Sequence, residues 1–218
     1  MQRLFLTLLM VAMAGIATAQ YIVPDTALTA KNAIYHRLGI SYNSLNFNDE
    51  DHPVLHPLSD IGTVPGMSLG YTIGLPVFRN RPVFFESGLE ANIFFASKDK
   101  SGVDMEFKWI SFSVPLNLKY YLRIPGTKLH ISPFVGLSLN FNAYGRLKSS
   151  AINDGGSVDL IFSNNGLIRT IERFTYDAHA GVGVDYNRCH FRFMYGYCES
   201  YNPYVLSDCL QFGFFYDI

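Results

Sequence analysis

Large apolar residues alternate with small or polar ones in the stretch GMSLGYTIGLPVF, from Gly66 to Phe78. The odd positions from Met67 to Val77 are all large and apolar, whereas the intervening positions from Ser68 to Gly74 are small or polar. Successive side chains of a β-strand point to opposite faces of the sheet, so this alternation predicts a strand with one apolar face. That face either covers a soluble core or faces lipid.

The same period of two occurs in eight stretches of the chain. They are Ile34–Asn43, Gly66–Phe78, Val83–Phe95, Trp109–Arg123, Leu129–Tyr144, Phe174–Asn187, Phe191–Cys198 and Asp208–Ile218. None of them shows the i, i+3, i+4, i+7 spacing of an amphipathic helix. The sequence therefore predicts an all-β protein with eight strands.

The connections between these stretches alternate between long and short. RNRP, IPGTK and NRCH are tight turns of polar residues, Gly and Pro, whereas the other connections have about 22, 13, 29 and 9 residues. Outer-membrane barrels have short periplasmic turns and long external loops, and a soluble β-sandwich has no reason to sort its loops in this way. The pattern predicts an eight-stranded antiparallel up-and-down transmembrane β-barrel, with short periplasmic turns and longer external loops.

The first residues, MQRLFLTLLMVAMAGIATAQ, have the pattern of a secretory signal peptide. Arg3 precedes an apolar run, and Ala17 and Ala19 form an A-x-A cleavage site. The apolar run is too short for a transmembrane anchor. We therefore expect residues 1–19 to be a signal peptide, residues 20–218 to form one barrel domain, and the protein to reach the bacterial outer membrane.

The composition agrees with a membrane barrel. The chain has 18 Phe and 14 Tyr, and only 16% of its residues are charged, whereas soluble domains average about a quarter. A net charge of −1 gives no argument for nucleic-acid binding. The expected partners are outer-membrane lipid, lipopolysaccharide and the outer-membrane assembly machinery, with other envelope proteins as further candidates.

The charged residues within the strands fall on the faces opposite the apolar ones. Eight of them are predicted to pair inside the barrel: Arg37, Lys119, Arg123 and Arg192 with Glu86, Glu90, Asp177 and Asp185. An eight-stranded barrel has an interior just wide enough for side chains to fill it. Asp185 and Arg192, which flank the NRCH turn symmetrically, are expected to face each other. The favoured interpretation is a structural plug, and a narrow pore or proton path is the alternative.

Candidate catalytic residues are few. His36 and Ser87 have outward parity but lie on different strands without an acid partner, and inward His179 beside Asp177 is interpreted as a polar core residue. Zinc motifs, G-x-S-x-G and phosphate-binding loops are absent from the sequence. We expect no enzymatic activity, cofactor or metal, and a structural or interaction role carried by the loops. A lipid-modifying outer-membrane enzyme is the alternative.

The chain has three cysteines, two of which have inward parity. Cys198 and Cys209 flank SYNPYVLS symmetrically. They form a disulfide across the hairpin if the strands pair in that register, or they act as two small apolar fillers; the sequence leaves both open. Cys189 lies in a predicted periplasmic turn, at no metal-binding spacing from His190.

Three segments resemble the PorT-like outer-membrane β-barrel family of Bacteroidetes-type bacteria. The matching residues are Val114, Pro115, Leu116, Leu118, Lys119 and Tyr120, then Pro133, Val135 and Gly136, and finally Arg192, Tyr195 and Gly196. These motifs describe a fold rather than a chemistry. The resemblance implies a barrel over most of the mature chain and a link with protein secretion.

The last predicted strand resembles the C-terminal signal that the outer-membrane assembly machinery reads. Gln211, Gly213, Tyr216 and Ile218 fit the spacing of that signal, with Ile in place of the usual terminal aromatic residue. The resemblance implies that this strand is the contact with the assembly machinery.

Overall fold

A computed structural model describes residues 34–48, 61–78, 81–100, 103–150, 157–159, 173–200 and 205–218. The predicted signal peptide, residues 1–19, lies outside these ranges. The strands are β1 (Tyr35–Asn48), β2 (Thr63–Pro76), β3 (Val83–Lys100), β4 (Val103–Tyr120), β5 (Leu122–Arg123), β6 (Leu129–Ser149), β7 (Ser157–Asp159), β8 (Phe174–Tyr186), β9 (Cys189–Ser200) and β10 (Val205–Asp217). The described residues contain no helix that is long and apolar enough to cross a membrane.

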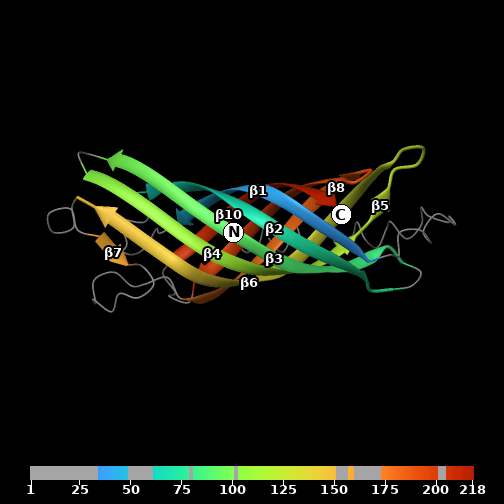
Figure 1. Ribbon diagram of the computed structural model, residues 1–218, viewed down its shortest axis with the longest axis horizontal. Coiled ribbons are helices and arrows are strands. Elements are labelled where there is room, and N and C mark those ends of the chain that lie inside the picture. Colours follow the sequence, from blue (N-terminus) through green and yellow to red (C-terminus); the bar gives the residue numbers. More distant parts are fainter. Residues whose placement is uncertain are drawn as a thin grey trace.

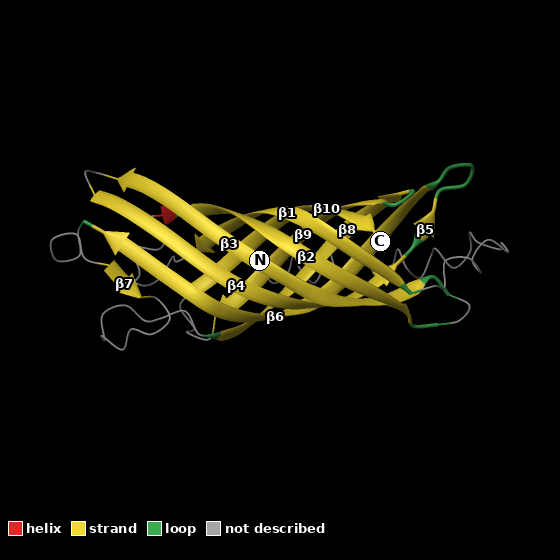
Figure 2. Cartoon of the chain, in the orientation of Figure 1, coloured by secondary structure: helices red, strands yellow, loops and turns green. Residues whose placement is uncertain are grey.

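Eight of the ten strands form a closed antiparallel ring (Figures 1 and 2). The order around the ring is β4-β3-β2-β1-β10-β9-β8-β6, and pairing of β4 with β6 closes it. The two short strands, β5 and β7, each pair with β6. Closure leaves the ring without a free edge and pairs its backbone groups internally, as a lipid environment requires. The predicted eight-stranded antiparallel barrel is confirmed.

Several strands are longer than the sequence pattern predicted. β3 and β4 each have 18 residues and β6 has 21. The predicted third strand ended at Phe95 and the predicted fourth began at Trp109, whereas these strands run to Lys100 and from Val103. The additional residues of β3, β4 and β6 lie at the end of the barrel that carries the long connections, where Figure 1 shows the ends of these strands beside β7.

The apolar side chains change sides along β4. From Ile110 to Leu118 the outward positions are apolar, and Leu118 is 50% exposed. Toward the long-loop end the outward positions are Glu106 and Lys108, both well exposed, whereas the inward side chain of Phe107 is fully buried. A strand that faces lipid is apolar outside, and a strand that faces water is apolar inside. The change of sides therefore marks where β4 leaves the apolar layer.

β6 shows the same change of sides. Leu137 and Leu139 point outward and are exposed, whereas further along the strand Arg146 and Lys148 are the exposed residues and Leu147 is fully buried. A shift in the β4–β6 register lies between these two segments and changes the parity of the outward positions. The predicted strands ended too early because they followed one continuous apolar face.

Large apolar side chains cover the outside of the ring below this level. They include Leu38, Ile40, Met67, Leu69, Leu89, Ile93, Leu137, Leu139, Phe193, Phe212 and Phe214, with Leu69 57% exposed. Soluble monomers rarely expose a continuous apolar surface of this extent. The surface corresponds to the lipid-facing band of an outer-membrane barrel. The apolar face of the stretch from Gly66 to Phe78 therefore lies on the outside of the ring and not around a soluble core.

A charge placed in the apolar band is expected to destabilise the barrel. Leu137 lies on the outward face of β6, with Leu116 and Ala178 opposite it on the neighbouring strands. Replacing Leu137 with Arg should lower the free energy of unfolding in lipid vesicles by about 2–4 kcal/mol, the cost of Arg at the midplane. Urea titration followed by fluorescence of the single Trp measures this loss.

The matched control is Ser97→Arg, at an exposed position of β3 beyond the apolar band. This variant should unfold at the same urea concentration as the unmodified protein, because its new charge remains in water. Equal losses for the two variants would contradict the assigned position of the apolar layer.

Candidate functional site

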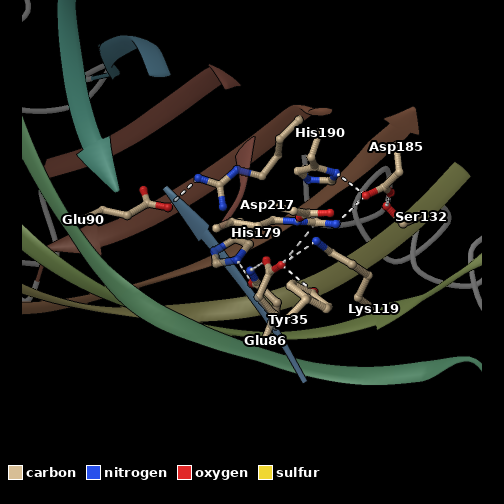
Figure 3. A network of polar contacts seen from close by, with 12 residues as sticks. Tyr35, Glu86, Glu90, Lys119, Ser132, His179, Asp185, His190 and Asp217 are labelled. Atoms are coloured by element: carbon tan, nitrogen blue, oxygen red, sulfur yellow. Dashed lines mark hydrogen bonds and ion pairs between the residues drawn. The ribbon is translucent and has the colours of Figure 1, made fainter. Parts of the chain in front are cut away.

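Polar and charged side chains fill the inside of the ring. The buried side chains that carry a charge or contact a charged group include Arg37, Glu86, Glu90, Lys119, Asp185, His190, Arg192 and Gln211. They come from β1, β3, β4, β8, β9 and β10, so the site is assembled across the lumen from strands far apart in the sequence. We call Arg37, Glu86, Lys119, Asp185, His190 and Asp217 the lumen network (Figure 3).

Arg37 contacts three carboxylates of the lumen network. Its Nη2 lies 2.5 Å from Asp185 Oδ1 and its Nε lies 2.6 Å from Asp217 Oδ1. Its Nη1 lies 3.9 Å from Glu86 Oε2. Because Arg37 and Asp217 stand opposite each other on β1 and β10, their ion pair also joins the first and last strands of the ring.

Glu86 has a second cation and two further hydrogen bonds. Its Oε2 lies 2.7 Å from the fully buried Nζ of Lys119 and accepts a hydrogen bond of 2.7 Å from the Tyr35 hydroxyl. Its Oε1 accepts a bond of 3.3 Å from Asn117 Nδ2. A buried carboxylate is costly unless it is both paired and hydrogen-bonded. Glu86 meets both conditions.

Asp185 completes the network on the opposite wall of the barrel. Its Oδ2 accepts a hydrogen bond of 3.1 Å from the Ser132 hydroxyl, and its Oδ1 lies 3.1 Å from His190 Nδ1. Asp185 and His190 stand opposite each other on β8 and β9. The carboxylate is thus surrounded by Arg37, a hydroxyl and an imidazole, with side-chain exposure of only 4%.

A second ion pair lies further along the lumen toward the long-loop end. Arg192 Nη2 donates to Glu90 Oε1, and Gln211 Nε2 donates to Glu90 Oε2 at 3.2 Å. The guanidinium of Arg192 lies 4.4 Å from the ring centroid of Phe215. Phe215 in turn covers Gly39 so closely that a Cβ on Gly39 would lie 2.4 Å from the ring, so only glycine leaves room for it.

His179 is the centre of a third polar group. Its Nδ1 lies 2.9 Å from Asp177 Oδ1 and 3.3 Å from Ser138 Oγ. Its Nε2 lies 2.6 Å from Asn117 Oδ1. Asn117 also donates to Glu86, so it connects this group to the lumen network. His179 is fully buried and hydrogen-bonded, in agreement with the prediction that it is a polar core residue.

Apolar layers cover the polar lumen at both ends. Toward the long-loop end, a buried cluster consists of Leu45, Phe47, Ile61, Val64, Phe94, Met105, Phe107, Trp109 and Leu147. At the short-turn end, the ring of Phe84 lies 5.6 Å from that of Tyr35 and 5.1 Å from that of Tyr121. The polar groups are thus enclosed between two aromatic-rich layers.

The structure brings together most of the charged residues expected in the lumen. Arg37, Glu86, Glu90, Lys119, Asp185 and Arg192 are buried in ion pairs, and Asp177 is partly buried beside His179. The prediction for Arg123 is wrong: this residue is exposed on β5, where the chain pairs only with β6. The alternation continued past the end of the ring, and parity alone does not show where the ring ends.

The predicted contact between Asp185 and Arg192 is also wrong. Asp185 stands opposite His190, and Arg192 stands opposite Gly183. The turn between β8 and β9 contains only Asn187 and Arg188, whereas the prediction assumed a longer turn. Asn187 has a φ of 54°, a left-handed conformation that Asn tolerates in two-residue hairpin turns. Shortening the turn shifts the register by two residues.

The register assumed for a disulfide is incorrect as well. Cys198 stands opposite Ser207, and Cys209 stands opposite Gly196, so the two cysteines are displaced by two residues along the hairpin. Cys209 carries a thiol, with Sγ 3.9 Å from the Leu210 carbonyl oxygen. It also packs against the buried apolar cluster, in agreement with the filler interpretation for this residue. Cys189 carries a thiol at the start of β9.

The remaining candidate residues do not form a catalytic group. Outward His36 has its Nδ1 2.6 Å from the Tyr71 hydroxyl, rather than beside a carboxylate. Ser87 lies on β3, opposite Ile73 of β2. Across the described ranges, no three His, Cys, Asp or Glu side chains come together as a metal-binding group.

The four residues of the expected assembly signal lie in or directly after β10, which pairs with β1 and β9. Gln211 and Gly213 face the lumen, whereas Tyr216 and Ile218 are exposed on the outside. Their recognition by the assembly machinery stays a prediction.

Sequence reasoning did not identify Tyr35, Asp217 and His190 as members of the site. Tyr35 and Asp217 have the inward parity of Arg37 and Gln211, so parity could have placed both in the lumen. His190 was assigned to a turn, and only the shorter turn places it in β9. Parity shows whether a side chain faces the lumen, but it does not show which side chain it contacts across the barrel.

No family model matches the chain, and no curated protein matches it in sequence. Solved structures with a similar fold include Ail, the attachment invasion locus protein of Yersinia pestis, at 13% identity and a TM-score of 0.48, covering 84% of this chain and 98% of that one. Neisserial surface protein A has 14% identity and a TM-score of 0.45, with 84% and 97% covered. The outer membrane enzyme PagL has 8% identity and a TM-score of 0.45, with 83% and 99% covered.

Removing the carboxylate at the centre of the lumen network is expected to destabilise the barrel. Glu86→Gln leaves Lys119 buried without its counter-charge, so the free energy of unfolding should fall by about 3–5 kcal/mol. The double variant E86Q/K119M removes both charges and should recover much of this loss. Urea titration in lipid vesicles measures all three proteins.

The exposed ion pair between Glu106 and Lys108 provides the control. Glu106→Gln should leave the urea midpoint unchanged within error, because exposed ion pairs contribute little to stability. An E86Q variant that unfolds at the midpoint of the unmodified protein would show that the lumen network does not stabilise the barrel.

Proposed function

We propose that this protein is an integral outer-membrane β-barrel with a sealed lumen, and that its role is structural or in protein interaction, carried by its long-loop end. The observation that supports the membrane location most directly is the change of sides of the apolar residues on β4 and β6. Below it, the outer surface suits lipid and the interior is polar. Above it, Lys108 and Arg146 face outward, and Phe107 and Leu147 fill the inside. Export by the predicted signal peptide belongs to the same proposal.

A sealed lumen is the preferred alternative to a pore. Arg37, Lys119 and Arg192 each have a carboxylate partner inside the barrel. The ring of Phe215 occupies the space beside Gly39 in the lumen, so this space does not hold a column of water. With the apolar layers at both ends, these contacts favour a plug that stabilises the barrel.

The long-loop end provides the surface for an interaction role. β3, β4 and β6 extend beyond the apolar band and carry exposed polar residues such as Ser97, Asp104 and Lys148 on their outward faces. The resemblance to the PorT-like family supports a partner among envelope proteins of a secretion pathway. The proposed role is not enzymatic. If so, deletion of the gene should leave the mass spectra of lipid A unchanged.

Site-specific photo-crosslinking in cells tests the interaction role. A crosslinking amino acid at the exposed position 97 of β3 should give a discrete protein adduct, because this position lies above the apolar band. The same amino acid at position 137, in the middle of the band, is the control and should give no protein adduct. Absence of an adduct from position 97 and from position 148 would contradict an interaction role for this end.

Single-channel recording tests the sealed lumen. The folded protein in a planar bilayer should give no stepwise conductance, because the lumen is filled between its two apolar layers. Protease protection of the barrel in the same lipid shows that the protein has inserted. Stepwise conductance by the inserted protein would establish a pore instead.

A further inference from the structure

Basic side chains gather on one arc of the outer surface, where the apolar band ends. Lys108 on β4, Arg146 and Lys148 on β6, and Arg173 just before β8 are all exposed. We call these four residues the basic arc. Arg173 extends over the outward ring of Phe141, 5.8 Å from its centroid. The arc therefore begins at the last apolar residues of the band and continues toward the long-loop end.

Two of these cations face each other directly. Lys108 and Arg146 stand opposite each other in the β4–β6 register. Like charges in directly opposed positions destabilise a sheet. An apolar or acidic residue at either position would remove this repulsion. The sequence nevertheless has a cation at both positions, and both side chains are exposed on the outer face of the barrel.

Few acidic groups offset the basic arc. Glu106 lies 2.5 Å from Lys108 and stands opposite Lys148, and the cations around it lower the pKa of its carboxyl, with Lys108 as the main cause. Arg146 donates a hydrogen bond of 2.8 Å to the Ser157 hydroxyl. Asp159 occupies the position opposite Arg146 on β7. Asp104, the next outward residue of β4, is also exposed. Among the described residues, the four cations of the basic arc are thus accompanied by three carboxylate positions.

The other outward positions at this end of the barrel are different. Those on β1, β3 and β10 that have described side chains are neutral or acidic: Ser44, Asn46, Ser97, Asp99 and Asp208. Lys98 of β3 is exposed as well, but its Nζ donates to the Ile61 carbonyl oxygen. Among the described residues, the outward-facing cations of this end are therefore concentrated on one side of the barrel, at the depth where lipid headgroups meet water.

We propose that the basic arc binds the phosphate groups of an anionic glycolipid in the leaflet at the long-loop end. Arg and Lys bind phosphate oxygens through charge-assisted hydrogen bonds. Acyl chains of the same lipid would lie against the apolar face below, at Tyr144 and Phe141, so one molecule would contact both surfaces. This inference depends on the proposed membrane location, and it names the lipid class that the outer surface recognises.

Lipid titration followed by native mass spectrometry tests the proposal. The folded mature protein in non-ionic detergent is titrated with bisphosphorylated lipid A, with dephosphorylated lipid A, or with inorganic phosphate. We expect discrete binding of the bisphosphorylated lipid, binding of the dephosphorylated lipid that is weaker by about tenfold or more, and no comparable adduct with inorganic phosphate.

The variant K108Q/R146Q/K148Q should bind both lipids equally weakly. Its matched control, R81Q/R123Q/K128Q, removes three exposed cations at the short-turn end and should keep the preference for the phosphorylated lipid. If both variants lose the preference for the phosphorylated lipid equally, the preference reflects general charge attraction and not a site at the basic arc. Unchanged binding by the first variant, or full competition by inorganic phosphate, would overturn a lipid site at the basic arc.

Insertion is measured separately, so that the two proposals fail in different ways. Each protein is folded into phosphatidylcholine vesicles and tested for protease protection. Insertion of all three proteins without a preference for phosphorylated lipid would refute the basic arc alone. Failure of the unmodified protein to insert would refute the membrane location.

Discussion

An eight-stranded barrel encloses a space about as wide as the side chains that point into it. Inward charged groups must therefore pair with other inward side chains, because little water is available to solvate them. Arg37 shows the consequence: its guanidinium contacts carboxylates of β3, β8 and β10. The interior acts as a polar core, whereas the apolar residues that a soluble protein would bury there cover the outside.

This constraint separates stability from function along the axis of the barrel. Within the apolar band, Glu86 and Lys119 form a buried ion pair that joins two strands and is out of reach of any external ligand. Beyond the band, the interior becomes apolar around Phe107 and Trp109, and the exterior becomes polar. The residues available for recognition are thus those at the long-loop end, including the basic arc.

The fold follows from the sequence because its signal is local. A period of two and the alternation of turn lengths are both read along the chain, and together they predict the number and order of the strands. The start of β4 at Val103 was missed because, near Trp109, the apolar side chains change from the outward face of the strand to the inward face. The error at Arg123 has the same origin, since alternation continues where the ring has ended.

The arrangement of the site could be predicted only in part, because its partners are not local. Parity placed Arg37, Glu86 and Asp185 in the lumen. Which of them meet depends on the stagger of eight strands around the ring, and this stagger accumulates from every turn. A single turn shorter than expected, at Asn187, was enough to exchange Arg192 for His190 opposite Asp185.

Spin labels along β6 test the central claim most directly, that lipid covers the barrel up to the change of sides. Nitroxides are attached one at a time, in a cysteine-free protein in lipid vesicles, and their collisions with oxygen and with a water-soluble nickel complex are compared. Positions 135, 137 and 139 should favour oxygen, positions 146 and 148 should favour nickel, and inward positions 138 and 147 should be shielded from both. High nickel accessibility at 135, 137 and 139 would contradict the account.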